Sequence, residues 1–562
     1  MSKIIGIDLG TTYSAIAQLD DLGNPEVLAS TDNNKKITAS AIYIKSQNVV
    51  VGDKALDALA ATPKNVVTET KRQMENDVVY SEEAGKWVDK DDNNKNLYSP
   101  AQISSFILSK LKSYTSDVKK VVITVPALFA EKARVATLDA AKMAGLEVIS
   151  LINEPTAAAC YYASLPNVKK ITGKILVFDL GGGTFDVTVC NCEGEKVEVI
   201  TSRGDKWLGG KDFDNELVNI MSDKYQKETG KSLDLENKNQ AYMEIAERIK
   251  RNLSLREKHA EVIEGPEGPK KIEITRNEFE QSIQTHIEKL KMLMEEALDG
   301  SGLKPENVSH TLLVGGSTRI PIVTETIKSV MKKPPLKGVN VDEAVAAGAA
   351  IYAGLQSRKS LNEAQKQAIS NVKLQDVCNF YLGTLIQEDD PVLNRKVTAN
   401  LILIDRDTPL PATMTKRIVT LYDDQEAISI EITQSEGREK NREFVNIIHE
   451  GELKFPDKKP KGRPIDVTYK YDTSGKLHCT FQDESSKEKY EISLRPESAE
   501  DLRKNKNLAD WMKKYRNHGM INRDNIEFWG TGRPLRQQLF VEDLADWDIE
   551  DPKGKSKRCH RS

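Results

Sequence analysis

The sequence predicts an α/β architecture of layered sheets over about the first 355 residues, followed by an all-β sandwich. Up to residue 355, apolar strand-like runs alternate with helix-like segments, which is typical of layered α/β proteins. From about residue 378 to 495 the chain becomes a series of short β runs separated by turn signals, which favours an antiparallel sandwich. At 562 residues the chain is too long for one core, so three or four structural units are expected.

Two glycine-rich loops of the same chemical type are the third observation. Ile5–Ser14 and Leu176–Asp186 each contain an apolar run, an aspartate, glycines and a hydroxyl residue. Glycine lets backbone N–H groups approach a phosphate closely, and threonine hydroxyls add donors. The aspartates at the strand ends, Asp8 and Asp179, can reach a hydrated divalent metal. Two such hairpins facing each other would hold a nucleoside triphosphate from both sides.

The elements of the α/β part follow from local patterns. Residues 121–126 form an apolar run that predicts a buried strand. Residues 131–145 place Ala and Leu on one face and end at a glycine, which predicts a helix. Residues 240–256 and 277–300 are charged and amphipathic, and predict helices whose charges mostly face solvent. A polar helical segment over 360–371 ends this part.

The change of pattern after residue 370 indicates the domain organisation. Alternating apolar and polar residues predict strands at 400–404, 427–432, 465–471 and 477–481. We therefore predict an α/β domain over 1–370, a linker over 371–377, a β-sandwich over 378–495 and a divergent segment over 496–562. The last segment holds three of the five tryptophans and ends in a basic tail that is expected to be disordered.

Composition excludes several classes of partner and location. A net charge of -4 with 30% charged residues gives no reason to expect nucleic acid or a membrane surface as a partner. Apolar runs are too short to span a bilayer, and the N-terminus enters the first strand at once, so we expect no signal peptide. The six cysteines lack paired metal-ligand spacing, which favours reduced thiols and a cytoplasmic location.

Six motifs together resemble the 70-kilodalton heat-shock chaperone family, the DnaK type, over roughly residues 3–495. The motifs are Gly6–Thr12, Ile123–Ala127, Ile152–Ala159, Phe178–Asp186, Leu208–Gly210 and Leu313–Pro321. The resemblance implies an actin-like ATPase domain of two lobes around a nucleotide cleft, and a β-sandwich that binds extended apolar peptide. It also implies ATP or ADP, Mg²⁺ and K⁺ as cofactors. The family's long helical lid is missing, because residues 496–562 are too few and differ in composition.

The resemblance implies a set of cleft residues with catalytic and metal-binding roles. Several buried carboxylates in one cleft would repel each other unless cations neutralise them. Lys71 matches the family lysine that positions the attacking water. The implied catalytic residues are Asp8, Lys71, Glu154, Asp179 and Thr184, and the implied metal site, mostly through water, is Asp8, Glu154, Asp179 and Asp186.

The nucleotide itself would contact both loops, one helix face and a facing turn. The residues at 247, 250, 251 and 254 share helical spacing and so project from one face. The implied phosphate contacts are Gly10, Thr11, Thr12, Tyr13, Gly181, Gly182, Gly183, Thr184, Gly209 and Gly210. The implied adenosine contacts are Glu247, Lys250, Arg251, Ser254, Gly315, Gly316, Ser317, Arg319 and Asp342.

The chain departs from the family pattern at the linker and at two binding surfaces. Lys373 and Gln375 interrupt the apolar linker, which predicts weaker docking of the linker on the ATPase domain. Ser150 stands where a J-domain co-chaperone contact normally has a basic residue, although Asp376 is retained. The peptide pocket has altered chemistry, and its implied residues are Thr384, Ile418, Leu421, Ile428 and Ile430.

The function that these features favour is an ATP-dependent molecular chaperone that hydrolyses ATP to control binding of unfolded or specific client polypeptides. Its expected partners are an extended client, a J-domain co-chaperone and a nucleotide exchange factor. A nucleotide-switched, dedicated binding or assembly protein is the alternative, favoured by the altered linker and the missing lid. A small-molecule kinase on the same fold is a third hypothesis, but it would not need residues 378–495.

Overall fold

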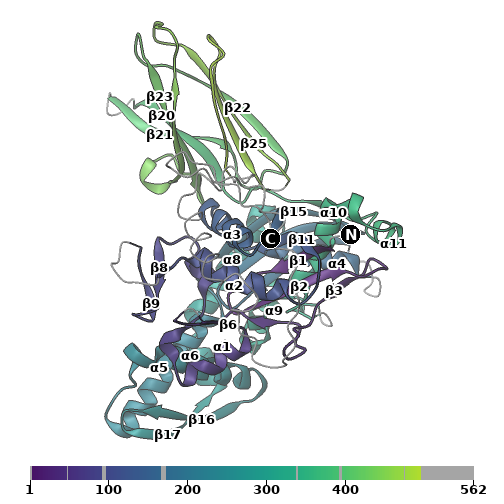
Figure 1. The fold of residues 1–562 in the computed structure, drawn as a ribbon, viewed down its shortest axis with the longest axis vertical. Coiled ribbons are helices and arrows are strands. Elements are labelled where there is room, and N and C mark those ends of the chain that lie inside the picture. Colours follow the sequence, from purple (N-terminus) through teal and green to yellow (C-terminus); the bar gives the residue numbers. More distant parts are fainter. Residues whose placement is uncertain are drawn as a thin grey trace, which may run out of the picture. The chain divides into compact units, whose positions relative to one another are not determined.

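The computed structural model describes residues 3–46, 48–90, 97–165, 172–336, 340–390, 395–473 and 475–494. Within these ranges the chain forms two mixed sheets covered by helices and a separate pair of antiparallel sheets (Figure 1). The predicted divergent segment 496–562, with its tryptophans and basic tail, lies outside the described residues. No helix in the described ranges is long and apolar enough to cross a membrane.

The first mixed sheet has the strand order β12-β11-β1-β2-β3, with β4 also paired to β2. Strand β1 runs parallel to β11 and antiparallel to β2. A buried cluster that includes Ile5, Ile7 and Phe106 joins the sheet to its helices. The elements are β1 (Lys3–Asp8), β2 (Tyr13–Leu19), β3 (Pro25–Val27), β4 (Thr38–Ala39), β11 (Val118–Val125), β12 (Glu147–Asn153), α2 (Pro100–Lys112) and α3 (Glu131–Met143).

The second mixed sheet repeats this hairpin arrangement, in the order β18-β13-β14-β15-β19. Strand β13 runs parallel to β18 and antiparallel to β14, as β1 does with β11 and β2. The elements are β13 (Gly173–Leu180), β14 (Phe185–Glu193), β15 (Lys196–Asp205), β18 (Val308–Val314), β19 (Lys373–Gln375), α5 (Gly210–Thr229), α6 (Leu235–Leu255), α7 (Arg276–Ser282), α8 (Gln284–Ser301) and α9 (Pro321–Met331). Each predicted glycine-rich loop is therefore the turn of one hairpin.

Two helices, α4 (Glu154–Ser164) and α10 (Ala344–Gln356), pack on each other between these sheets. Helix α10 contacts β1, β2 and β11, whereas α4 contacts β13, β14 and β15. The approach is so close that a Cβ on Gly348 would lie 1.8 Å from the carbonyl oxygen of Ala157. A Cβ on Gly6 would likewise lie 2.2 Å from the nitrogen of Ala350. Glycine is required at both positions, and the fixed spacing sets the distance between the two turns.

Shorter elements surround the two mixed sheets. Strands β6-β5-β7 and β10-β8-β9 form three-stranded sheets, and β16 pairs with β17. The elements are β5 (Ile42–Lys45), β6 (Asn48–Val51), α1 (Asp53–Asp57), β7 (Val66–Val67), β8 (Val78–Ser81), β9 (Lys86–Asp89), β10 (Leu97–Tyr98), β16 (Lys258–Gly265), β17 (Gly268–Thr275) and α11 (Glu363–Ala368). The helix predicted over 277–300 is interrupted at Ile283 between α7 and α8, and the helix predicted over 360–371 is reduced mainly to α11.

The two antiparallel sheets have the orders β21-β20-β23-β24 and β22-β25-β26-β27. Their facing side chains form one buried cluster that includes Ile430, Ile432, Val467, Tyr469 and Phe481. Strand β26 alternates buried and half-buried residues along its whole length, as the sequence pattern predicts. The strands are β20 (Tyr381–Asp390), β21 (Arg395–Ile404), β22 (Ala412–Val419), β23 (Ala427–Ser435), β24 (Asn446–Lys454), β25 (Pro464–Tyr471), β26 (Leu477–Asp483) and β27 (Lys489–Ser493).

The predicted linker forms β19, which pairs in parallel with β15. Lys373 and Gln375 point to solvent, whereas Leu374 is half-buried against an apolar cluster. Successive side chains of a strand face opposite sides, so the two polar residues leave the docked face apolar. The structure thus shows the linker paired with β15, and the weaker docking expected from Lys373 and Gln375 stays a prediction.

The contact between α4 and α10 allows a test of the packing. Replacing Gly348 with alanine should lower the free energy of unfolding by about 1–3 kcal/mol, because a backbone carbonyl cannot move aside cheaply. Gly437→Ala is the control, since its Cβ would meet only the flexible carboxylate of Glu439. Urea unfolding of both variants measures the difference. Equal stability of Gly348→Ala and the parent would contradict this account of the helix contact.

Candidate functional site

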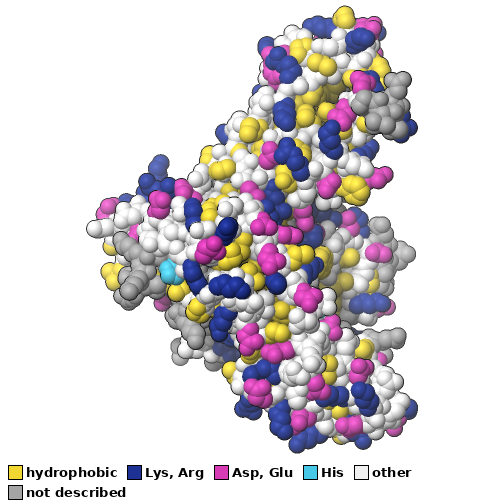
Figure 2. Space-filling view, turned by 180° about the vertical axis from the view of Figure 1, so that it is seen from behind, with side chains coloured by type: hydrophobic (Ala, Val, Ile, Leu, Met, Phe, Trp, Pro, Cys, Tyr) yellow, Lys and Arg dark blue, Asp and Glu magenta, His cyan; other side chains and the backbone are white. Residues whose placement is uncertain are grey.

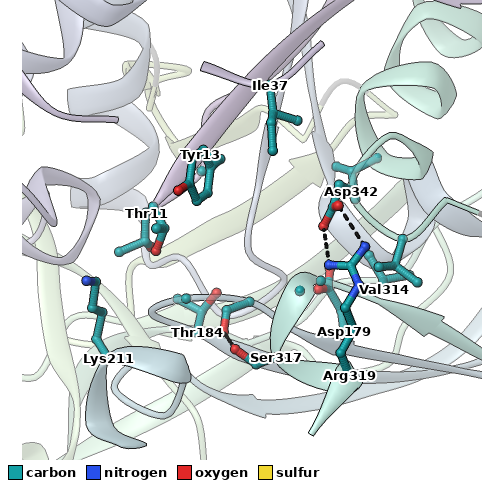
Figure 3. Close-up of a pocket in the computed structure, with 18 of the residues that line it drawn as sticks. Thr11, Tyr13, Ile37, Asp179, Thr184, Lys211, Val314, Ser317, Arg319 and Asp342 are labelled. Atoms are coloured by element: carbon teal, nitrogen blue, oxygen red, sulfur yellow. Dashed lines mark hydrogen bonds and ion pairs between the residues drawn. The ribbon is translucent and has the colours of Figure 1, made fainter. Parts of the chain in front are cut away.

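A cavity of about 380 Å³ lies between the two glycine-rich turns (Figure 3). Both hairpins, helices α5 and α6 and the turn after β18 contribute side chains to its wall. The structure thus brings together residues separated by more than 300 positions in the chain. The predicted site residues that line the cavity are Asp8, Gly10, Thr11, Thr12, Tyr13, Lys71, Glu154, Asp179, Gly181, Gly182, Thr184, Glu247, Lys250, Arg251, Ser254, Gly315, Gly316, Ser317, Arg319 and Asp342.

The two turns face each other, with the side chains of Thr11 and Thr12 against the bare backbone of Gly182 and Gly183. A Cβ on Gly182 would lie 1.9 Å from Thr12 Oγ1, and one on Gly183 would lie 2.6 Å from Thr11 Oγ1. Thr12 Oγ1 is buried and has no hydrogen-bond partner within the described ranges. An unpaired buried hydroxyl costs free energy unless a ligand supplies its partner. The cradle therefore fits a ligand with oxygen acceptors, such as a polyphosphate.

Four predicted site residues lie behind the cavity wall. A Cβ on Gly209 would lie 2.6 Å from the nitrogen of Gly183, and the nitrogen of Gly210 donates to the oxygen of Gly181 over 3.0 Å. These two glycines therefore support the second turn from outside. Asp186 is 2% exposed, and its Oδ2 accepts from the nitrogen of Ala127 over 3.4 Å. Gly183 turns its carbonyl away from the cavity toward Arg72.

Among the carboxylates that line the cavity, Asp8, Glu154 and Asp179 interact electrostatically with one another, and the buried Asp186 adds to their repulsion. Burial, reinforced by the charge of Glu154, raises the pKa of Asp8 to about 7. The same two causes raise the pKa of Asp186 to about 7, and burial raises the pKa of Asp179 well above its usual range. Ionising all of these carboxyls together is therefore unfavourable, and a bound cation would favour their charged forms.

Lys71 places a positive charge beside the carboxylates of the cleft. Its ammonium forms an ion pair with Glu154, is almost fully buried and lies 5.7 Å from the ring centre of Phe129. Burial alone would lower the pKa of Lys71, but Glu154 and Asp8 reverse the effect and raise it. The lysine therefore stays charged and sits beside the carboxylates on the cavity wall.

The carboxylate arrangement bears on the kind of metal site. Across the described part of the chain, no group of three or more His, Cys, Asp or Glu side chains is placed to ligate one ion directly. Mg²⁺ keeps several of its waters and needs only one or two protein carboxylates together with phosphate oxygens. Asp8, Glu154 and Asp179 therefore suit a Mg²⁺ ion that keeps its waters better than an ion bound by protein atoms alone.

The far end of the cavity has the chemistry of a nucleoside site. Arg251 on α6 donates to the Tyr13 hydroxyl over 2.8 Å and pairs with Glu247 over 2.6 Å. Arg319 pairs with both oxygens of Asp342, over 3.0 and 2.8 Å, as Figure 3 shows. Apolar side chains including Ile37 and Val314 complete the wall. Flat guanidinium groups beside apolar residues suit the face of a base.

Sequence reasoning missed two cavity residues on α5, Lys211 and Asp214. Lys211 pairs with Glu247 over 3.2 Å, and Lys250 pairs with Asp214 over 2.7 Å. Burial opposes ionisation of Glu247, but Lys211, Lys250 and Arg251 lower its pKa to about 2. The signal available was their place directly after the motif Leu208–Gly210, where a helix begins beside the cleft.

The predicted peptide-binding residues lie on the antiparallel sheets and not at the cavity. Thr384 and Ile430 are each 1% exposed, and the Thr384 hydroxyl donates to the carbonyl of Glu431 over 3.0 Å. Ile418 and Ile428 are half-buried at the edge of the same cluster, and Leu421 is half-buried in the turn after β22. Thr384 and Ile430 therefore belong to the packed interior, and the other three are the accessible part of the set.

Comparison with known proteins adds two findings. The model of the Hsp70 protein family matches residues 4–539. The mitochondrial-type heat shock protein 70 of Encephalitozoon cuniculi (strain GB-M1) is 34% identical over 529 residues, which cover 88% of this chain and 84% of that protein. The cytoplasmic location predicted from composition is wrong by this comparison, because the relative is of the mitochondrial type.

The raised carboxyl pKa values predict proton release when Mg²⁺ and nucleotide bind. Between about pH 4 and 7 the folded, nucleotide-free protein binds protons that the unfolded chain does not, since Asp8 and Asp186 titrate near 7 instead of 3.8. Their stability contribution therefore falls as pH rises through that window. A cation favours the charged carboxylates, so binding should release more protons at pH 6 than at pH 8. Calorimetry in buffers of different ionisation heat counts these protons.

The control for this measurement is Asp139→Asn on α3, whose carboxyl pKa is raised to about 6 by burial, but which does not line the cavity. Asp139→Asn should leave the number of protons released on binding unchanged, whereas Asp186→Asn should reduce that number. Equal release at both pH values in the parent would contradict the assignment of proton-bearing carboxyls to the cleft.

Proposed function

The chain belongs to the Hsp70 protein family, and from this premise we propose that it is an ATP-dependent molecular chaperone that hydrolyses ATP to control client binding. The observation that carries the proposal is the meeting of both glycine-rich turns with the cleft carboxylates and Lys71 at one cavity. We further propose residues 1–370 as the ATPase domain, 371–377 as the linker and 378–495 as the client-binding sandwich, with 496–562 in place of a lid.

The proposed roles at the cleft follow from its chemistry. Backbone N–H groups of both turns and the hydroxyls of Thr11, Thr12 and Thr184 would bind the phosphates. Mg²⁺ would neutralise phosphate charge when bound, held through water by Asp8, Glu154 and Asp179, and K⁺ would occupy the same acidic cleft. Lys71 would orient the attacking water. Phosphoryl transfer depends on positioning and electrostatics, which this set of groups can provide.

The sandwich would bind a client polypeptide in extended form. Backbone hydrogen bonds supply affinity in such a mode and side-chain pockets supply selectivity. Ile418, Leu421 and Ile428 are the accessible apolar residues of the proposed set. Met414, Val419 and Tyr422 nearby in the chain are exposed, and Figure 2 shows apolar side chains among charged ones on the sandwich, at the top of the view.

Co-chaperones complete the proposal. We propose a J-domain partner and a nucleotide exchange factor, as the family generally uses. The J-domain contact would differ in this chain, since Ser150 is 4% exposed and Asp376 accepts a 2.9 Å hydrogen bond from Asn153 Nδ2. Neither residue offers a free charged group in this structure.

Steady-state ATPase activity with and without an apolar peptide tests the proposal. Hydrolysis that the peptide stimulates supports an ATP-driven chaperone. Hydrolysis without stimulation would favour a nucleotide-switched dedicated binding protein. Transfer of phosphate to a metabolite would instead identify a kinase, and absence of ATP binding would overturn the whole assignment.

Lys71→Ala should retain nucleotide binding and lose hydrolysis. The substitution removes the cation beside Glu154 without touching either turn, so the water-positioning group is lost while the phosphate cradle remains. Loss of one positioned cationic group costs on the order of 10²–10³ in rate. Single-turnover assays with radiolabelled ATP measure the rate, and calorimetry measures binding. Lys35→Ala, which removes an exposed lysine paired with Asp53, is the control. Turnover of Lys71→Ala at the parent rate would contradict the role.

Leu374→Ser in the linker should reduce peptide stimulation of the ATPase while basal hydrolysis persists. The half-buried Leu374 is the apolar contact of β19 with the second sheet, and removing it weakens the docked strand by about 1–2 kcal/mol. Lys373→Ser is the matched control, because that side chain points to solvent. Full stimulation in Leu374→Ser would show that β19 does not carry the coupling.

A further inference from the structure

Each of the four carbonyls of the second glycine-rich turn, from Gly181 to Thr184, accepts a hydrogen bond. The oxygen of Gly181 accepts from the Ser317 hydroxyl over 2.9 Å and from the nitrogen of Gly210 over 3.0 Å. The oxygen of Gly182 accepts from the nitrogen of Lys211 over 2.8 Å. The oxygen of Thr184 accepts from the nitrogen of Gly181 over 3.0 Å. Hydrogen bonds to all four carbonyls hold the backbone of the turn in one conformation.

The carbonyl of Gly183 is held by a side chain from a distant part of the chain. Arg72 donates to it twice, from Nε over 3.1 Å and from Nη2 over 2.9 Å. The same guanidinium binds the carboxylate of Asp212, with Nη1 to Oδ1 over 3.2 Å. Arg72 lies in the short 3-10 helix Thr70–Gln73, whose neighbour Met74 is part of the core of the first sheet. Among the donors to the turn in the described part of the chain, Arg72 alone comes from the side of the first sheet.

The carboxylate end of this contact holds the start of helix α5. Asp212 Oδ2 also accepts from the nitrogen of Gly209 over 2.7 Å, so it closes the first turn of the helix. The Arg72 side chain is 9% exposed, and its Cζ lies 5.9 Å from the ring centre of Trp207. Charge-assisted, two-pronged contacts of a guanidinium fix geometry more strongly than a single hydrogen bond, and the shielding from water strengthens them.

Arg72 and Lys71 are consecutive residues whose side chains go to different partners. Lys71 reaches Glu154 on the cavity wall, and Arg72 reaches the carbonyl of Gly183 in the second turn. One segment of backbone therefore sets the distance between the ammonium of Lys71 and the N–H groups of Gly181–Thr184. An error of about 1 Å in such a distance can cost about 100-fold in rate.

We infer that Arg72 is a positioning residue for ATP hydrolysis. Its hydrogen bonds to Gly183 and Asp212 keep the second turn at a fixed distance from Lys71. The inference rests on the proposed function, because it assigns Arg72 a part in ATP binding and turnover. The inference predicts that ATP hydrolysis needs the planar guanidinium group with its several N–H donors, and not only its positive charge. Lysine keeps the charge but cannot span a carbonyl and a carboxylate in the same plane.

The test compares Arg72→Met and Arg72→Lys with the parent and with Arg417→Lys in the full chain. Arg417 also donates two hydrogen bonds to one carboxylate, the side chain of Asp466 on the sandwich, and so serves as the matched control. Single-turnover hydrolysis, ATP affinity and the nucleotide-free unfolding midpoint are measured for each. We expect Arg72→Met to lose at least about tenfold in single-turnover rate and Arg72→Lys to lose nearly as much, with unfolding midpoints close to the parent. Arg417→Lys should hydrolyse ATP at the parent rate.

Parent-like rates in both Arg72 variants would overturn the inference while leaving the proposed function intact. The inference would also be overturned if Arg72→Lys lowered the nucleotide-free unfolding midpoint together with the single-turnover rate. Destabilisation of the fold would then explain the lower rate. Full activity of Arg72→Lys with an inactive Arg72→Met would show that charge alone matters, which also overturns it. A parent that neither binds nor hydrolyses ATP would overturn the proposed function as well.

Discussion

The structure depends on a close contact between two turns, the second of which carries no side chain from Gly181 to Gly183. Thr11 and Thr12 approach Gly182 and Gly183 so nearly that a single added carbon would collide with them. The contact is possible because α4 and α10 hold the two mixed sheets at a fixed separation, and that separation in turn needs glycine at Gly348. Packing between α4 and α10 thus sets the geometry of the cavity, to which α4 also contributes Glu154.

The buried carboxyls of the cleft repel each other when ionised, so a bound cation would favour their charged forms. Buried carboxylates have pKa values near neutrality because burial and Glu154 oppose their ionisation. Lys71 neutralises part of this charge, and at the other end Lys211, Lys250 and Arg251 hold Glu247 ionised. The acidic end suits hydrated Mg²⁺ and the basic end suits a polar nucleoside, which is a physical reason for a phosphate chain to lie between them.

The sequence predicted those features that local patterns encode. The two turns, the strand at 121–126 and the helix from Glu131 could be predicted because composition and spacing within a few residues determine them. Lys211, Asp214 and Arg72 could not, because their partners lie in other elements; Arg72 and Asp212 are 140 positions apart. The pairing of the linker could not be predicted from polarity alone, because strand geometry turns Lys373 and Gln375 to solvent and leaves Leu374 against the apolar cluster. Composition carried no signal for location, and a relative of the mitochondrial type contradicted that prediction.

The central claim is that the two turns form one phosphate cradle, and ATP affinity of Gly182→Ala tests it most directly. The added carbon would lie 1.9 Å from Thr12 Oγ1, so the turns must separate. Calorimetric titration with Mg²⁺–ATP, with Gly437→Ala as the control, should show at least about tenfold weaker binding by Gly182→Ala, because the phosphate donors lose their common geometry. Unchanged affinity would mean that the turns do not bind phosphate together, and would contradict the account of the site.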